Sequence, residues 1–274
     1  MPKDIVVNLT VAGTRDAAAA YAVSVAQTFD AYLAAVAFAY EPVLPAIVGG
    51  GIPESVIEEQ REENDKAAKT AVAQFEAAAK AVKHDTRVVP ASLAGAADTF
   101  GEIARVYDLS IVGQSERERV GPEELIVEGA LFGSGQPVMV VPPEYSGGMR
   151  LERVLVCWNG GRNAARATGN ALPFLRRANQ VEVVTVSTDV AAAAVTSAND
   201  LCRHLERHGI NISSKRIEPG SKKVSESILN YAGSSGAGLI VMGGYGHSRL
   251  REFILGGTTR GVLKAMTVPT LMSH

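Results

Sequence analysis

Short apolar runs alternate with longer amphipathic or alanine-rich stretches along the whole chain. Apolar runs of about four to eight residues bounded by Gly, Pro or polar clusters predict buried strands, and the longer stretches between them predict helices. The expected strands lie at residues 5–9, 34–39, 86–89, 109–112 and 138–141, and again at 154–157, 181–187, 212–217, 239–242 and 267–271. Because strands and helices alternate, we expect an α/β protein with parallel strands covered by helices.

The strand and helix pattern occurs twice, which indicates a duplicated domain. Residues 13–18 of the first half resemble residues 161–165 of the second, and residues 109–113 resemble residues 239–243. Each half also ends in a strand that follows a proline. Such self-similarity predicts two copies of one architecture. We therefore expect two tandem five-stranded parallel sheets of the Rossmann-like, nucleotide-binding kind.

A cluster of Pro, Gly and Ser at residues 142–148 separates the copies and is typical of a domain boundary. It predicts an N-terminal domain at residues 1–143 and a C-terminal domain at residues 150–274. The N-terminal copy has extra residues between its second and third strands. Of these, residues 42–53 predict a loop and residues 54–82 one long helix, whose acidic start suits the helix dipole.

Composition and charge narrow the class of protein. With 274 residues, 46% of them apolar, the chain has enough material for a buried core, which excludes a disordered or fibrous protein. A net charge of −2 argues against a chain built to bind nucleic acid or to coat a membrane. The total hides a division, because residues 1–150 carry 12 Lys and Arg against 21 Asp and Glu (net −9), and residues 151–274 carry 15 against 8 (net +7).

Cysteine content and the start of the chain predict a compartment. Two cysteines, Cys157 and Cys202, are too few for a disulfide framework, which favours a reducing environment. The first residues lead into a strand-like segment without the regions of a signal peptide. No apolar run reaches the roughly 18 residues of a membrane span. We therefore expect a soluble, cytoplasmic protein with no membrane partner.

The fourth strand of the second half leads into a glycine-rich segment. In open parallel sheets, ligands bind at the carboxyl ends of strands where the strand order reverses. Gly243 and Gly246 would let the backbone turn sharply and approach a ligand. Gly256 precedes the last helix, whose start offers unpaired N–H groups, a positive dipole end and the hydroxyls of Thr258 and Thr259. These groups fit an anion such as a phosphate.

The spacing of these glycines distinguishes the segment from common phosphate loops. The chain has neither Gly-x4-Gly-Lys-Ser/Thr nor Gly-x-Gly-x-x-Gly after the first strand of either half. The spacing Gly243-x2-Gly246-x9-Gly256 instead resembles the universal stress protein family, whose ATP-binding members carry Gly-x2-Gly-x9-Gly-Ser/Thr after the fourth strand. The resemblance covers nearly the whole chain, as a tandem-domain member. It implies the five-stranded fold in both halves and a regulatory role in the stress response.

The resemblance also implies a site for ATP or a related adenine nucleotide, with or without Mg²⁺, in the C-terminal half. The implied binding residues are Asn159, Val186, Met242, Gly243, Gly246, His247, Arg249, Gly256, Gly257, Thr258 and Thr259. Of these, Val186 and Met242 would flank the base. Two positions depart from the family pattern, because Gly257 replaces the hydroxyl residue and Asn159 replaces an Asp near the adenosine. An Asn keeps an acceptor and adds two donors, so a contact with adenosine stays chemically available.

The charge division fits this assignment. Arg162, Arg249, Arg251 and Arg260 lie in or near predicted loops at the ligand end of the basic half, where they would attract a polyphosphate. The alternative is that they are ordinary solvated surface charges. In the acidic half, residues 113–124 lack the second glycine and carry several carboxylates that would repel an anion. We expect that half to be structural or regulatory.

Other functions have less support in the sequence. No nucleophile elbow, paired carboxylates or dedicated base predicts catalysis, so a slow ATPase using His247 ranks behind nucleotide binding. Cys202, His204 and His208 share a helix face but lack a fourth ligand at a known spacing, so we interpret them as ordinary residues. A protein-interaction module that presents the acidic helix at residues 54–82 is the main alternative.

The duplication predicts an assembly within the chain. Single-domain members of the family pair through their last strands, and a fused pair resembles such a dimer made covalent. The strands at residues 138–141 and 267–271 are therefore expected to meet in a pseudo-twofold arrangement. A further homodimer of the whole chain stays open.

Overall fold

The computed structural model describes residues 1–11, 16–42, 53–115, 121–186, 191–245 and 257–274. In the first half the elements are β1 (Asp4–Asn8), α1 (Ala17–Phe29), β2 (Tyr32–Tyr40), α2 (Glu54–Ala78), β3 (His84–Ala91), α3 (Leu93–Ala104), β4 (Leu109–Gly113), α4 (Pro122–Gly133) and β5 (Val138–Val141). In the second half they are β6 (Arg153–Cys157), α5 (Arg162–Leu175), β7 (Gln180–Val186), α6 (Ala191–Glu206), β8 (Ile212–Ile217), α7 (Val224–Ser235), β9 (Leu239–Gly243), α9 (Thr258–Ala265) and β10 (Thr270–Ser273). The predicted α/β class with parallel strands is confirmed.

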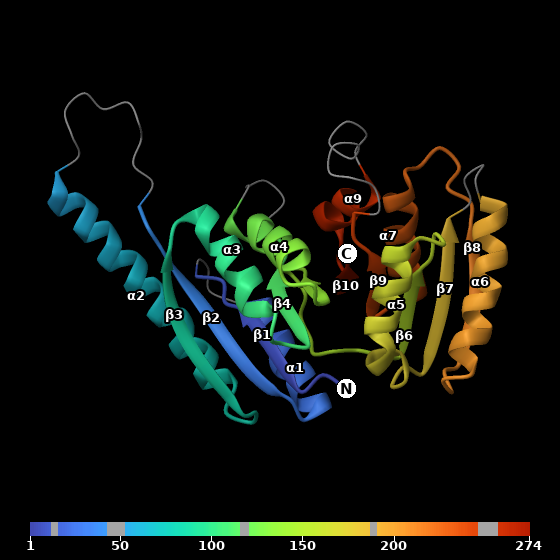
Figure 1. The fold of residues 1–274 in the computed structure, drawn as a ribbon, viewed down its shortest axis with the longest axis horizontal. Helices are drawn as coiled ribbons and strands as arrows, with labels where there is room; N and C mark the ends of the chain where they lie inside the picture. The colour runs from blue at the N-terminus through green and yellow to red at the C-terminus, as the bar shows by residue number, and fades with distance from the viewer. Residues whose placement is uncertain (12–15, 43–52, 116–120, 187–190, 246–256) are drawn as a thin grey trace.

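All ten strands belong to one sheet, in the order β3-β2-β1-β4-β5-β10-β9-β6-β7-β8 (Figure 1). Neighbouring strands are parallel except at the centre, where β5 and β10 pair antiparallel with Leu271 opposite Met139. The predicted meeting of the two last strands is therefore confirmed. Because the order within each half is the same, the β5–β10 pair relates the halves by a pseudo-twofold axis.

The element boundaries differ most from the prediction at the start of the last strand and at the end of the long helix. The last strand begins at Thr270, three residues later than expected from the apolar run. Pro269 has no N–H to donate to a ladder, so regular pairing starts after it. The long helix α2 ends at Ala78, before the expected residue 82. The chain needs the following residues to turn into β3 at His84.

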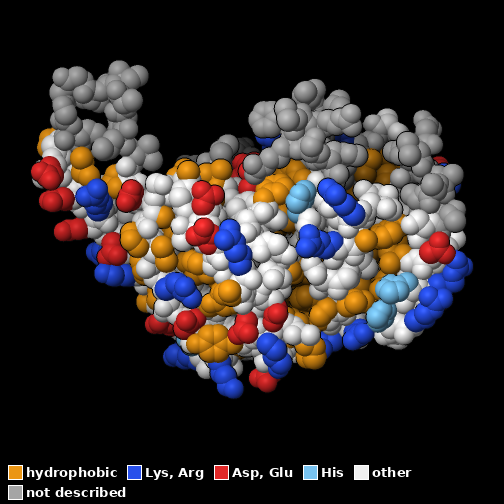
Figure 2. Space-filling model, viewed as in Figure 1, with side chains coloured by type: hydrophobic (Ala, Val, Ile, Leu, Met, Phe, Trp, Pro, Cys, Tyr) orange, Lys and Arg blue, Asp and Glu red, His pale blue; other side chains and the backbone are white. Residues whose placement is uncertain are grey.

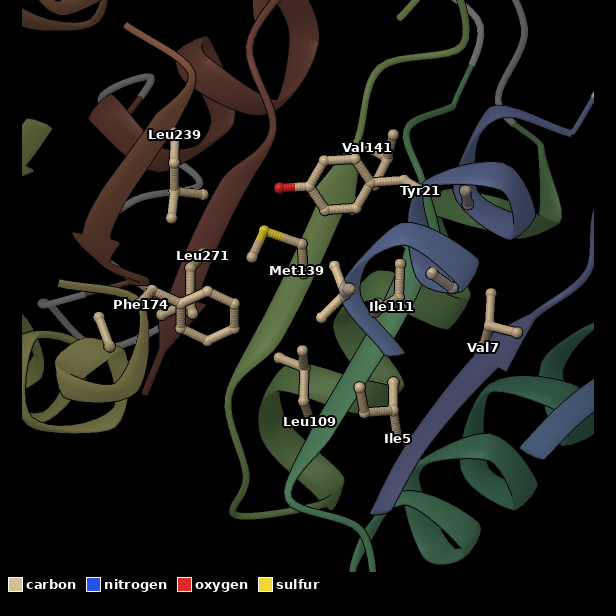
Figure 3. Close-up of a cluster of buried hydrophobic side chains, with 14 of the residues drawn as sticks. Ile5, Val7, Tyr21, Leu109, Ile111, Met139, Val141, Phe174, Leu239 and Leu271 are labelled. Atoms are coloured by element: carbon tan, nitrogen blue, oxygen red, sulfur yellow. The ribbon is translucent and has the colours of Figure 1, made fainter. Parts of the chain in front are cut away.

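The hydrophobic core continues from one half into the other. Phe29 of α1 and Phe174 of α5 meet edge to face with centroids 4.9 Å apart, and the Arg177 guanidinium lies over the Phe29 ring. Figure 3 shows the row of side chains that passes from Ile111 through Met139 and Leu271 to Phe174. Such edge-to-face and cation–π contacts add to the burial of apolar surface. The halves are thus joined by packing as well as by the central strand pair.

The linker between the halves is fastened to the core. Tyr145 is buried, its ring contacts Tyr21 of α1, and its hydroxyl donates to the Gly148 carbonyl and accepts from Arg150 Nε. Ser24 of α1 also accepts a hydrogen bond from the Met149 N–H at 2.8 Å. The Pro, Gly and Ser content of this segment therefore marks a tight connection. The division into domains at residues 143 and 150 stays a prediction.

The charge division is visible on the surface. In Figure 2, most of the visible Asp and Glu side chains lie over the first half at the left, whereas Lys and Arg dominate the second half at the right. Part of the acidic charge lies on α2, whose buried residues Ala68, Ala71 and Phe75 all belong to its second half. Its first ten residues are exposed or half-buried. In the part of the chain that the structure describes, no helix is long and apolar enough to cross a bilayer.

Candidate functional site

The strand order of the second half reverses between β6 and β9. These strands are paired, with Cys157 opposite Met242 at their carboxyl ends, and the helices α5 and α9 that come after them in the chain belong to different core clusters. Because strand-to-helix connections diverge at such a point, the carboxyl ends of the two strands border the place where open α/β sheets bind ligands. Trp158 and Asn159 follow β6, and Gly243 ends β9.

The packing at the end of β9 requires a glycine at position 243. A Cβ at this position would lie 2.6 Å from the Ala164 N and 2.7 Å from the Asn163 carbonyl carbon. The start of α5 therefore lies directly against the end of β9, and only a residue without a side chain fits between them. The sequence predicted that a glycine is needed here because a ligand approaches the backbone closely. The structure shows that the start of α5 approaches this backbone closely and excludes a side chain.

Two buried side chains hold the turn after β9. Asn163 Nδ2 donates to the Gly244 carbonyl at 2.8 Å and to the Tyr245 carbonyl at 3.3 Å. From the other side, the Thr259 hydroxyl accepts a hydrogen bond from the Tyr245 N–H at 3.0 Å. Tyr245 has a φ of 46°, a left-handed conformation that L residues rarely adopt. These contacts fix the direction in which the chain leaves the sheet.

The two threonines at the start of α9 differ in role. Thr259 is 3% exposed and its hydroxyl accepts from the turn, so it positions the turn and is shielded from a ligand. Thr258 is half-buried and is the first residue of α9. Gly257 occupies the N-cap and has no side chain to cap the helix. The first N–H groups of α9 and the Thr258 hydroxyl therefore form an uncapped helix start, which favours anions.

The residues implied to contact the nucleoside are placed as follows. Asn159 is exposed, and its Oδ1 accepts the Gly161 N–H at 2.9 Å, which leaves the Nδ2 amide as the group that can donate to a ligand. Met242 is 5% exposed, and its side chain belongs to a core cluster that includes Val262 of α9. Val186 is half-buried at the end of β7. Of these, Asn159 is the most open to a ligand.

Several implied site residues lie outside the described part of the chain. They are Gly246, His247, Arg249 and Gly256, together with the predicted ligand-attracting Arg251. Arg162 and Arg260 are described. Both are exposed, Arg162 as the first residue of α5 and Arg260 as the third of α9.

The corresponding edge of the first half is built differently. The Glu123 carboxylate lies against Gly121 at the start of α4, so closely that a Cβ at Gly121 would collide with its Oε2. The Ser115 hydroxyl accepts from the Gly121 N–H at 3.4 Å. Burial, and then the charge of Glu123, raise the pKa of Tyr40 at the end of β2. The chain's own carboxylate thus lies at the start of α4, whereas the first turn of α9 contains no acidic residue.

The cysteines and histidines form no reactive group in the described residues. Burial raises the pKa of Cys157 to about 12, so it stays a thiol at neutral pH. His204 of α6 and His208, which lies two residues beyond the end of that helix, contact each other edge to face, and His208 Nδ1 lies 3.0 Å from Arg176 Nη2. Within the described ranges, no group of three or more His, Cys, Asp or Glu side chains could hold a metal ion.

Sequence reasoning missed Asn163. One signal was available, because Asn163 lies four residues before Ala167 and eight before Ala171 on the buried face of α5. A polar residue on such an apolar stripe is buried with a partner more often than not. Nothing in the sequence indicates which backbone carbonyls it contacts, because Gly244 is 81 residues away.

Comparison with known proteins finds one matching family model, a related sequence and similar solved structures. Residues 150–274 match the model of the universal stress protein family. A universal stress protein of Synechocystis sp. is 25% identical over 142 residues, which cover 50% of this chain and 46% of that protein. The match therefore spans less than half the length of this relative.

Two solved structures share the fold over nearly the whole chain. A universal stress protein from Archaeoglobus fulgidus aligns with a TM-score of 0.72 and 17% identity, covering 98% of this chain and 96% of that one. A protein from Pseudomonas aeruginosa, described as a putative universal stress protein, aligns with a TM-score of 0.60 and 13% identity, covering 99% and 93%. At these identities the likeness concerns the fold alone, and it extends across both halves.

Proposed function

We propose, from the premise that this chain belongs to the universal stress protein family through residues 150–274, that it binds ATP or a related adenine nucleotide in its C-terminal half. The nucleotide would lie at the carboxyl ends of β6 and β9. Binding would serve regulation in the stress response of the cytoplasm, without a need for turnover. Mg²⁺ would accompany the phosphates where ATP is the ligand.

The start of α9 is the observation that carries this proposal. Its N-cap is Gly257, its first residue is the half-buried Thr258, and its second residue, Thr259, contacts the turn that follows β9. A phosphate is the ligand that such a helix start stabilises best. Asn159 Nδ2 can donate to a ribose oxygen at the end of the neighbouring strand β6. The exposed Arg162 and Arg260 add positive charge.

Titration calorimetry with ATP, ADP and AMP tests the proposal. Replacing Thr258 by Val removes the hydroxyl while keeping the shape, and we expect ATP affinity to fall about tenfold through one lost hydrogen bond to a charged group. The matched control is Thr267→Val, an exposed threonine beyond the other end of α9, which should bind ATP like the wild type. Absence of heat with millimolar ATP for the wild type would refute nucleotide binding.

A protein-interaction role is the second candidate, favoured by α2. Its exposed first ten residues include Glu54, Glu58, Glu59, Glu62 and Glu63. A solvated acidic helix that extends along the sheet edge offers a surface for a basic partner (Figure 1). Replacing these five residues by Gln should release such a partner from the full chain in a salt-dependent pull-down. A partner that stays bound to the variant would exclude this surface.

A further inference from the structure

The turn after β9 is contacted by side chains from the other half of the chain. Leu131 of α4 packs against Gly244 so closely that a Cβ at Gly244 would lie 2.8 Å from Leu131 Cδ2. The next residue, Phe132, places its ring 5.1 Å from the ring of Tyr245. It also lies 4.8 Å from the ring of His274, edge to face. The end of α4 therefore covers the start of the glycine segment of the second half.

Tyr245 needs this support. A residue other than Gly in the left-handed region costs about 1–2 kcal/mol, and such a conformation persists only where the surroundings hold it. Within its own half, Asn163 and Thr259 bind the backbone of Tyr245. Phe132 contacts the ring of Tyr245 from the other half, with the two ring centroids 5.1 Å apart. The side chain of Tyr245 is thus held in part from across the junction.

A contact of the same kind joins the turn after β4 of the first half to the last helix of the second half. Gln114, which follows β4 in the first half, donates from Nε2 to the Leu263 carbonyl of α9 at 2.6 Å. The last helix of each half therefore contacts the turn that follows the fourth strand of the other half. Val262 of α9 and Met266 at its C-cap also share one core cluster with Val127 and Leu131 of α4. This reciprocity couples the edge of the acidic half to that of the basic half.

We propose that Phe132 of the acidic half is a positioning residue for the nucleotide site of the basic half. It holds Tyr245, and with it the first turn of the glycine segment, in the conformation that binds the ligand. The inference rests on the proposed function. It assigns the acidic half a defined part in ligand binding, although that half has its own helix start occupied by Glu123.

Full-chain variants test this role with two measurements, ATP affinity by calorimetry and hydrogen exchange of the Tyr245 amide. Phe132→Ala should weaken ATP binding about three- to tenfold, because one aromatic pair is lost. It should also speed hydrogen exchange of the Tyr245 amide, which donates its hydrogen bond to the Thr259 hydroxyl. Phe132→Tyr keeps the ring at a half-buried position and should restore both values. The control Phe75→Ala removes a buried ring on α2; it should lower stability and leave both values unchanged.

The outcomes separate the two proposals. If the wild type binds ATP and Phe132→Ala binds it equally well, the positioning role is wrong, even if amide exchange changes. If Phe75→Ala weakens binding as much as Phe132→Ala, the effect is general destabilisation and the inference also fails. If the wild type binds no nucleotide, the proposed function fails and the inference fails with it.

Discussion

The two halves treat the start of their last helix in opposite ways. At α4 the Glu123 carboxylate lies on the helix start and interacts electrostatically with Tyr40. At α9 the N-cap is also a glycine, Gly257, and the second helical residue, which corresponds to Glu123, is the uncharged Thr259. Because a helix start attracts negative charge, the first half meets this demand with the Glu123 carboxylate, whereas the first turn of α9 contains no acidic residue. Under the proposed function, a few residues at one strand edge decide whether a copy of the fold binds a ligand or supports the other copy.

We expect the largest difference in the free energy of unfolding between the two halves when the glycines that end β4 and β9 are replaced. A Cβ at Gly243 would meet backbone atoms at 2.6 and 2.7 Å, whereas a Cβ at Gly113 would meet only the Thr10 hydroxyl oxygen at an ordinary 3.6 Å. Gly243→Ala should lower the free energy of unfolding by about 3 kcal/mol, and Gly113→Ala should change it by about 0.5 kcal/mol or less. Urea unfolding of both variants measures this, and equal losses would contradict the comparison.

We expect an intermediate difference in the free energy of unfolding when the residues at the ends of β1 and β6 are exchanged. The register places Asn8 where the second half has Cys157. Asn8 is buried, and its Oδ1 has no hydrogen-bond partner within the part of the chain that the structure describes. Asn8→Cys should therefore raise the free energy of unfolding by about 1 kcal/mol, because an unpaired buried polar group is removed. The reverse change, Cys157→Asn, should lower it. Thermal unfolding in reducing buffer checks both, and a less stable Asn8→Cys variant would reject the assignment.

Removal of the carboxylate at α4 has the smallest expected effect. Glu123→Gln should lower the free energy of unfolding by about 0.3–1 kcal/mol through loss of a favourable interaction with the helix dipole. It should also lower the pKa of Tyr40, since the charge of Glu123 contributes to raising it. Spectrophotometric titration follows the tyrosine. Glu226→Gln, at an exposed position in the first turn of α7, is the control and should cost less. If Glu123→Gln and Glu226→Gln lower the free energy of unfolding equally, the carboxylate of Glu123 stabilises its helix start no more than an ordinary first-turn carboxylate does.

The fold was predictable because burial in a parallel sheet leaves a strong pattern. Strands such as β5 and β9 are continuous apolar runs, and the two last strands met as expected from the duplication. The exceptions have local causes. Pro269 delays β10 because it cannot donate to the ladder, and the linker around Tyr145 is fixed by contacts with α1 that no composition rule contains.

The candidate site was predictable only in part. The importance of Gly243 and of the start of α9 follows from spacing along the chain. The contacts of Asn163 with Gly244 and of Phe132 with Tyr245 join residues that are 81 or more positions apart in the sequence. Local sequence patterns therefore do not predict these contacts. Thr259 shows a further difficulty. A hydroxyl at a helix start predicts a ligand contact, yet its burial and its bond to the Tyr245 N–H make it a support.

The pairing of β5 with β10 also determines how many sites one molecule can carry. The edge strand β5 of one half and the edge strand β10 of the other pair with each other within one chain. The effective concentration of one half around the other therefore does not depend on expression level or dilution. An acidic half always meets a basic half, and two basic halves cannot pair through these strands. The remaining sheet edges, β3 with Pro90 and β8 with Lys215 and Arg216, carry residues that discourage further strand addition. The fusion therefore combines, in every molecule, one helix start that carries Glu123 with one whose first turn has no acidic residue.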